Sequence, residues 1–293
     1  IVAIVVGIIA LKGGGSGNSS ASAKNELFHE GLLTASTGDK WGYIDKTGSY
    51  IINPQFDDAY SFSDNGLAVV RSGKKYGYID KTGSYVINPQ FDDANTFANN
   101  GLAVVKSGDK YGYIDKTGSY VINPQFDDAN TFADNGLAVV KSGNKYGYID
   151  KTGSYVINPQ FDDADDFTDN GLACVESGDM YGYIDKTGSY AINPQFSFAY
   201  SFTDDGLALV NDDGKYGYID KTGSYAINLQ FDDANSFNEG VAVVELGDRY
   251  ALIDTQGKYI VNPMYDDMGT RISSGLVYFA DEDGKIGYLN TSG

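Results

Sequence analysis

The stretch YGYIDKTGSYVINPQFDDA, from Tyr111 to Ala129, decides the fold because nearly the same string recurs along the chain. The aromatic-Gly pair that opens it repeats every 35 residues between Trp41 and Tyr216. The last two intervals are 34 and 36 residues, and the chain holds eight copies in all. A fixed period in this range predicts a repeat architecture, in which each copy is one supersecondary unit that stacks on its neighbours.

Each copy reads as an antiparallel meander. The segments GLAVVKSG from Gly101, KYGYID from Lys110 and SYVIN from Ser119 are short β-branched and aromatic runs separated by the turn sequences SGD and DKTG. In DKTG, Asp115 can accept a local backbone hydrogen bond, and Gly118 can supply the left-handed conformation of a type I turn with a following bulge. We therefore expect three strands per unit joined by tight hairpins.

The third strand is expected to end at Asn123, because Pro124 cannot donate a hydrogen bond to a sheet. The segment PQFDDANTFADN then leads to the next unit and can hold a fourth, shorter strand. Both faces of the strands are apolar, which predicts that each meander lies between the meanders before and after it. We also expect Gly112 to let an aromatic ring of a neighbouring strand or unit lie against bare backbone.

The predicted fold class is therefore all-β, with tandem antiparallel meanders of 35 residues stacked as an open superhelical array. The alternative is a closed propeller of about seven or eight blades.

The unit GLAVVKSGDKYGYIDKTGSYVINPQFDDANTF resembles the WG repeat of bacteria, also called KWG, over roughly Gly31 to Gly293. That family's pattern has a Trp-Gly pair, an IDKTG turn, an I-x-P-Q-F/Y segment and an F-x-x-G-L-A segment. The chain departs from it in that Trp stands only at Trp41, with Tyr in most other copies, and the last two copies drift to YALIDTQG and IGYLNTSG. The resemblance implies an all-β repeat array, often behind a membrane segment, with no established general activity.

Three regions are expected along the chain. Residues 1–11, IVAIVVGIIAL, are too few to cross a bilayer as a helix, so we interpret them as the end of a longer hydrophobic anchor. A signal peptide cleaved after ASA at Ala21 to Ala23, and hence a secreted protein, is the alternative. Residues 12–26 have the Gly/Ser composition of a flexible linker, and residues 27–293 form the repeat array. These features predict a membrane-anchored protein of the cell envelope with extracytoplasmic repeats.

Composition argues against several function classes. With 40 acidic and 21 basic residues the net charge is −19, which disfavours nucleic acid as a partner. Cys174 stands where other copies have Val and reads as a small core residue. Because His29 is the single histidine, a histidine-based zinc cluster or catalytic dyad is not expected. We expect no enzyme activity and no cofactor.

Paired acids recur after the third strand of most copies and are the obvious candidates for acid/base catalysis or calcium binding. Glycoside hydrolysis needs two carboxylates in different environments, which identical pairs do not provide. A bare Asp-Asp also lacks the spaced ligands of a calcium loop, so weak repetitive calcium binding is kept only as an alternative to loop solvation and capping. The pairs are Asp57-Asp58, Asp92-Asp93, Asp127-Asp128, Asp162-Asp163, Asp232-Asp233 and Asp266-Asp267.

One copy breaks this rule, and its residues are the candidate ligand-facing patch. Where other copies read FDDA, the chain has Ser197 and Phe198, and Tyr200 follows where three other copies have Asn, although Tyr60 shows that an aromatic residue at this position is not unique. One interpretation is an exposed aromatic anchor. The other is that Phe198 folds inward and fills volume lost where Ala191 replaces a bulkier Val.

Two functions of different classes fit this sequence. The array can be a scaffold that binds a protein or polysaccharide, or it can be a structural spacer without a dedicated ligand. A binder should concentrate unusual aromatic exposure in one region, whereas a spacer should not.

Overall fold

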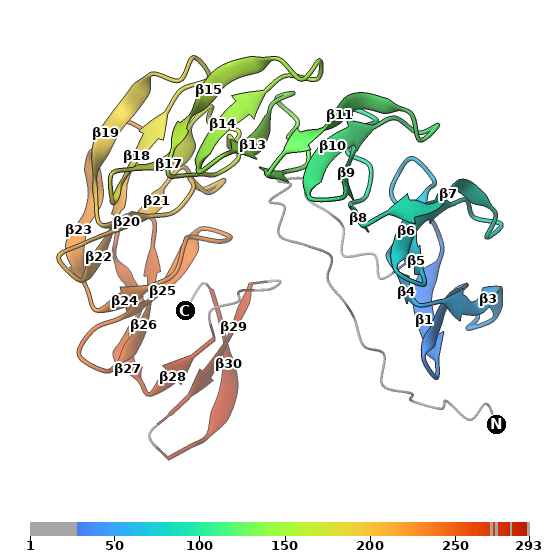
Figure 1. Ribbon diagram of the computed structural model, residues 1–293. Coiled ribbons are helices and arrows are strands. Elements are labelled where there is room, and N and C mark those ends of the chain that lie inside the picture. The colour runs from blue at the N-terminus through green and yellow to red at the C-terminus, as the bar shows by residue number, and fades with distance from the viewer. Residues whose placement is uncertain (1–27, 270–271, 273–274, 282, 292–293) are drawn as a thin grey trace, which may run out of the picture. The chain divides into compact units, whose positions relative to one another are not determined.

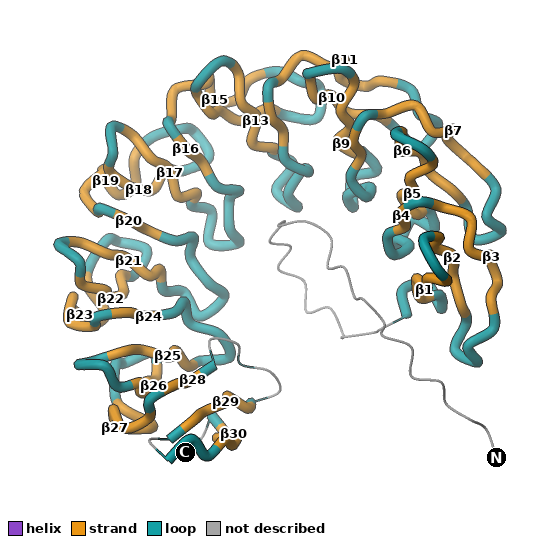
Figure 2. Tube along the Cα trace, turned by 60° about the horizontal axis from the view of Figure 1, so that its bottom comes forward, coloured by secondary structure: helices purple, strands orange, loops and turns teal. Residues whose placement is uncertain are grey.

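The computed structural model describes residues 28–269, 272, 275–281 and 283–291, and these residues form strands and loops without a helix (Figures 1 and 2). No membrane-spanning helix is found among them. The expected anchor, residues 1–11, and the expected linker, residues 12–26, lie outside the described residues.

The described residues divide into two compact units, one up to Pro159 and one from Gln160. Strands β1 to β15 are β1 (Leu33–Thr37), β2 (Lys40–Ile44), β3 (Tyr50–Phe56), β4 (Asp58–Ala59), β5 (Ala68–Ser72), β6 (Lys75–Ile79), β7 (Tyr85–Phe91), β8 (Asp93–Ala94), β9 (Ala103–Ser107), β10 (Lys110–Ile114), β11 (Tyr120–Phe126), β12 (Asp128–Ala129), β13 (Ala138–Ser142), β14 (Lys145–Ile149) and β15 (Tyr155–Phe161). Strands β16 to β30 are β16 (Asp163–Ala164), β17 (Ala173–Ser177), β18 (Met180–Ile184), β19 (Tyr190–Phe196), β20 (Phe198–Ala199), β21 (Ala208–Asp212), β22 (Lys215–Ile219), β23 (Tyr225–Phe231), β24 (Asp233–Ala234), β25 (Val241–Glu245), β26 (Tyr250–Asp254), β27 (Tyr259–Tyr265), β28 (Asp267–Met268), β29 (Leu276–Ala280) and β30 (Ile286–Asn290).

These strands form separate antiparallel sheets whose order follows the sequence. A typical sheet, β8-β9-β10-β11, has a two-residue strand, two five-residue strands and a seven-residue outer strand. The described part of the first sheet, β1-β2-β3, and of the last, β28-β29-β30, has three strands. The predicted meander and its short fourth strand are confirmed, with the short strand standing first in the sheet of the following unit.

The DKTG turn forms as its sequence predicts. The Asp115 carboxylate accepts hydrogen bonds from the Thr117 N–H at 2.8 Å, the Thr117 hydroxyl at 2.6 Å and the Ser119 N–H at 3.1 Å. Gly118 has φ 85°, a conformation that glycine adopts without steric cost. These side-chain hydrogen bonds of the turn therefore all lie within residues 115–119.

The third strand does not end at Asn123, which corrects the expectation from Pro124. Strand β11 continues to Phe126, and its register with β10 shifts between the pairs Tyr113↔Ile122 and Tyr111↔Phe126. The extra residues form a bulge on an edge strand, where proline is tolerated because no ladder hydrogen bond is lost.

This bulge also corrects the expected role of Gly112. A Cβ on Gly112 would lie 2.6 Å from the Ile122 carbonyl oxygen and 2.7 Å from the Pro124 nitrogen. The three atoms nearest to this Cβ position all belong to the bulged backbone, which therefore fills the space beside Gly112. The same geometry recurs at Gly42, Gly77, Gly147, Gly182 and Gly217.

Within each compact unit, consecutive sheets pack face to face. On β9, Val105 joins a cluster with Tyr78 of the preceding sheet, whereas Val104 joins a cluster with Val140 of the following sheet. In the second unit, Cys174 packs with Val210 of the next sheet, so it is a core residue as predicted. The apolar core is therefore divided into layers between sheets.

The seven-residue outer strand of a typical sheet differs from the expectation that neighbouring meanders cover both of its faces. Val121 keeps 46% of its surface exposed, and Val86 and Val156 are similarly exposed. Only the inner strands are covered on both sides, because the bulged outer strand lies at the edge of the sheet.

Candidate functional site

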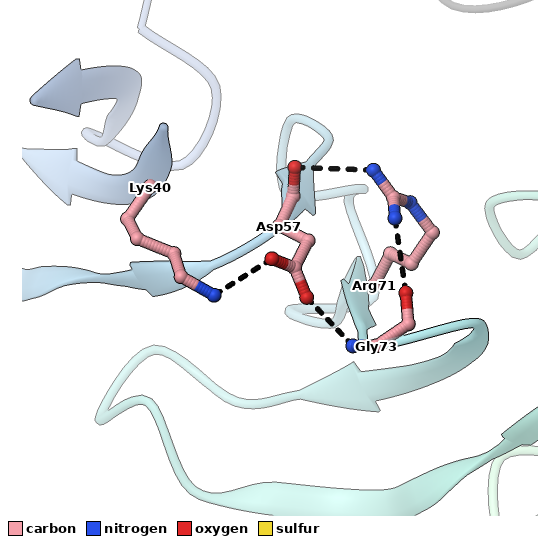
Figure 3. Close-up of polar contacts among 4 residues, drawn as sticks. All are labelled: Lys40, Asp57, Arg71 and Gly73. Carbon is pink, nitrogen blue, oxygen red and sulfur yellow. Dashed lines mark hydrogen bonds and ion pairs between the residues drawn. The ribbon is translucent and has the colours of Figure 1, made fainter. Parts of the chain in front are cut away.

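The first acid of several pairs acts as a carboxylate clamp, shown for Asp57 in Figure 3. The Asp57 carboxylate accepts hydrogen bonds from the Lys40 ammonium at 2.7 Å and from the Gly73 N–H at 2.6 Å, while Arg71 donates to the Asp57 carbonyl at 3.2 Å. Lys40 belongs to one sheet and Gly73 to a hairpin turn of the next. The carboxylate clamp thus joins two consecutive sheets.

The same clamp recurs at Asp92, where Lys75 and the Gly108 N–H donate, and at Asp127, where Lys110 and the Gly143 N–H donate. At each of these sites the lysine hydrogen bond, followed by the glycine N–H, lowers the pKa of the aspartate below its ordinary value. A carboxylate with a lowered pKa is a poor general acid.

The expected role of these acids was local capping, whereas the partners of the Asp57 carboxylate lie 16 and 17 positions away in the sequence. Among the described residues, no group of three or more His, Cys, Asp or Glu side chains could hold a metal ion.

The clamp is lost at the copy that breaks the repeat. Met180 stands where other copies have the clamp lysine, and Ser197 stands where they have the clamp aspartate. The Ser197 hydroxyl instead donates to the Asp212 carboxylate at 3.0 Å. Both clamp partners have thus been replaced together, which removes a constraint between sheets β16–β19 and β20–β23.

Phe198 and Tyr200 lie on the surface of this copy. Their exposed fractions are 40% and 42%, and the Phe198 ring contacts the Tyr181 ring at 5.0 Å and the Tyr200 ring at 4.9 Å between centroids. These distances are typical of favourable aromatic pairs. Three rings from two consecutive sheets therefore meet at the broken clamp.

The alternative interpretation of Phe198 as a core filler is wrong. Ala191 is itself exposed, as are its counterparts Val86, Val121 and Val156, so the smaller residue leaves no internal void to fill.

These rings border a cleft of about 240 Å³, which we call the aromatic cleft. Its other polar lining comes from three carboxylates, Asp163, Asp165 and Glu176. Desolvation by the surrounding protein raises the pKa of Asp165 and the charge of Asp163 adds to this, whereas a 2.7 Å hydrogen bond from the Ser201 hydroxyl lowers it. The lining of the cleft holds three carboxylates and no basic side chain, which gives it a negative potential.

The lining of the aromatic cleft also includes a buried thiol. Cys174 is 3% exposed, and desolvation, with the charges of Asp165 and Asp163, raises the pKa of its thiol. Since the thiolate is the reactive form, Cys174 is an inert lining group.

The structure places the predicted residues Phe198 and Tyr200 in the lining of the aromatic cleft, whereas Ser197 is not part of that lining, and it adds residues that the sequence reasoning missed. The signals were present in the sequence, because Met180 and Glu176 each replace a residue that is lysine in the two preceding copies. Their significance depends on Phe198 of the next repeat, which lines the aromatic cleft together with Glu176.

The chain belongs to the WG-repeat family. The model described as "WG containing repeat" matches seven consecutive segments, at residues 41–76, 76–111, 111–146, 146–181, 181–216, 216–250 and 250–285. No protein in the curated set matches the chain.

Solved structures resemble the chain in fold. The crystal structure of the eukaryotic initiation factor matches with a TM-score of 0.60 and 11% identity, over 88% of this chain and 81% of that chain. The crystal structure of Saccharomyces cerevisiae Sqt1 matches with a TM-score of 0.45 and 10% identity, over 89% of this chain and 92% of that chain. At these identities the first likeness concerns the fold alone, and the second is too weak to support an argument.

Proposed function

We propose that this WG-repeat chain is a non-enzymatic scaffold that binds a partner protein or polysaccharide through the aromatic cleft. The observation that supports this proposal is the meeting of Tyr181, Phe198 and Tyr200 at the copy where the clamp is lost. Exposed aromatic residues often dominate binding interfaces, and a spacer without a ligand gives no reason to gather them at one position.

A catalytic role is disfavoured by the same geometry. The aromatic cleft is smaller than the ~300–1,000 Å³ that small-molecule sites enclose. Three of the repeated acids, Asp57, Asp92 and Asp127, form carboxylate clamps between sheets. Their pKa values are lowered.

The test is a binding screen of the full chain against cell-wall glycans and host glycoproteins, with and without a double change, Phe198→Asp and Tyr200→Asn. This variant restores the consensus residues of other copies, so it should fold. We expect it to lose partner binding while its melting temperature barely changes, because both rings are exposed. A variant that is strongly destabilised, or one that binds every partner as well as the wild type, contradicts the proposal.

For localisation, we propose that the repeats are extracytoplasmic and attached to the cell envelope, with a secreted form as the alternative. The support is the apolar run of residues 1–11 followed by the Gly/Ser-rich residues 12–26. Protease shaving of intact cells, with the wall removed where necessary, should release the repeats. Full protection together with recovery in the cytosolic fraction contradicts this assignment.

A further inference from the structure

Two ordinary repeats supply their own cation to the tyrosine that corresponds to Tyr181. The Lys106 ammonium lies 5.1 Å from the Tyr111 ring centroid, and the Lys141 ammonium lies 4.8 Å from the Tyr146 ring centroid. Each lysine also stands opposite an aspartate of the short strand, Asp93 or Asp128, in the sheet register. In these repeats the position beside the ring is therefore a cation site filled from within the chain.

The repeat with the aromatic cleft reverses the charge at this position. Glu176 replaces the lysine and stands opposite Asp163, while Tyr181 donates a hydrogen bond to Glu176 at 3.3 Å. Asp165 replaces an asparagine of the two preceding copies, which brings the carboxylates at the cleft to three. Like charges directly opposite in a sheet are destabilising, so a cation from outside would relieve this arrangement.

The rings complete a site for such a cation. Tyr181, Phe198 and Tyr200 offer aromatic surface, and the carboxylates lie in the same cleft. Ammonium and guanidinium groups are attracted both to ring faces and to carboxylates. The net charge of −19 further favours a basic partner through long-range attraction.

We propose that the aromatic cleft binds a lysine or arginine side chain presented by a basic segment of a partner protein. This inference rests on the proposed function and specifies its ligand: the partner's cation takes the place that Lys106 and Lys141 occupy in the two preceding repeats.

A later repeat provides a matched control. Glu245 stands opposite Asp233 and contacts Tyr250 as Glu176 contacts Tyr181. There, however, Asp267 and Gly269 occupy the positions of Phe198 and Tyr200, so the site is acidic and lacks the counterparts of these two rings. Asn235 also stands in the place of Asp165, so this site has the opposed pair of carboxylates without the third acid and without the two rings.

The experiment titrates the full chain with a Gly/Ser peptide that carries one central lysine, and with its norleucine counterpart, by ligand-observed NMR. We expect the lysine peptide to bind and the norleucine peptide not to bind. Glu176→Lys restores the residue of the preceding repeats and should weaken binding by at least about tenfold, since it fills the site from within. Phe198→Asp should also weaken binding, whereas Glu245→Lys should leave it unchanged.

Other outcomes overturn the inference and separate it from the proposed function. Equal loss in Glu176→Lys and Glu245→Lys would show attraction to negative charge without the cleft. A glycan or protein whose binding needs Phe198 and Tyr200 but is unaffected by Glu176→Lys would refute the cation site and keep the scaffold function. Equal binding of lysine and norleucine peptides also refutes it. Melting temperatures of all variants show that each remains folded.

Discussion

At the residue scale, the glycine of the aromatic-Gly pair is fixed by backbone geometry. The bulge around Asn123 and Pro124 brings the Ile122 carbonyl oxygen to 2.6 Å from the position of a Gly112 Cβ. Real Cβ atoms do not approach backbone this closely, so any side chain displaces the outer strand. The repeated glycine is thus required by a contact within its own sheet.

Gly112→Ala is therefore expected to lower the free energy of unfolding by about 3 kcal/mol, because the rigid bulge has to shift. Urea denaturation of the full chain measures this change. Gly108→Ala is the control, since its φ of 63° is strained for alanine but nothing lies within 4 Å of its Cβ. That variant should lose about 1 kcal/mol. Equal effects of the two changes would contradict the steric argument.

Phe198 illustrates what single residues in a repeat sequence do and do not reveal. Its departure from the FDDA consensus is evident in the sequence. The sequence alone, however, is compatible with either a buried or an exposed Phe198 ring. Exposure of Ala191, and contacts of Phe198 with Tyr181 and Tyr200, decide for the surface. The Phe198 ring contacts Tyr181 of the preceding sheet, and the local sequence does not specify this contact.

At the scale of elements, the hairpin turns make stability depend on pH. The Thr117 hydroxyl, followed by backbone N–H groups, lowers the pKa of Asp115 below its ordinary value, and Asp45, Asp80 and Asp150 behave in the same way with their own threonines. A lowered folded-state pKa means that the unfolded chain binds protons more readily. The turns therefore stabilise the fold above the ordinary aspartate pKa of about 4 and lose this contribution as the pH falls through the folded-state values.

We expect the free energy of unfolding to fall between about pH 5 and pH 2, since unfolding takes up protons in this window. Urea denaturation across that range tests it. Asp115→Asn removes one titrating group but keeps a side-chain oxygen that can accept hydrogen bonds, so this variant should show a weaker pH dependence. A stability that stays constant over the window would contradict the prediction.

At the scale of the molecule, the sheets depend on one another because their cores are shared. Tyr113 is fully buried, its ring lies 4.8 Å from Phe132 of the following loop, and its hydroxyl donates to the Asn130 carbonyl at 2.7 Å. Ala138 and Val140 of the next sheet complete the same cluster. A single sheet therefore leaves one face of its core exposed.

A peptide of residues 93–126, which covers strands β8 to β11, should be unfolded in water, because an isolated sheet has no neighbour to cover its apolar faces. Circular dichroism of the peptide, with the full chain as the folded control, measures this. A cooperative thermal transition in the isolated peptide would contradict the shared-core argument.

The open superhelical arrangement of the whole array stays a prediction, with a closed propeller of about seven or eight blades as its alternative. Small-angle scattering of the full chain distinguishes the two. We expect an elongated particle, and the profile of a compact disc would contradict the open array.

The sequence by itself determined the period, the meander, the DKTG turn and the family, because these features depend on residues close together in the chain. Only the tertiary structure decided that β11 runs through Pro124, that Gly112 lies under the bulge, and that Phe198 meets Tyr181 at an acidic cleft. The last of these contacts joins residues of consecutive repeats whose consensus letters are nearly identical. The chemistry of this cleft depends on which non-consensus residues contact one another. The stacking of one sheet on the next determines those contacts.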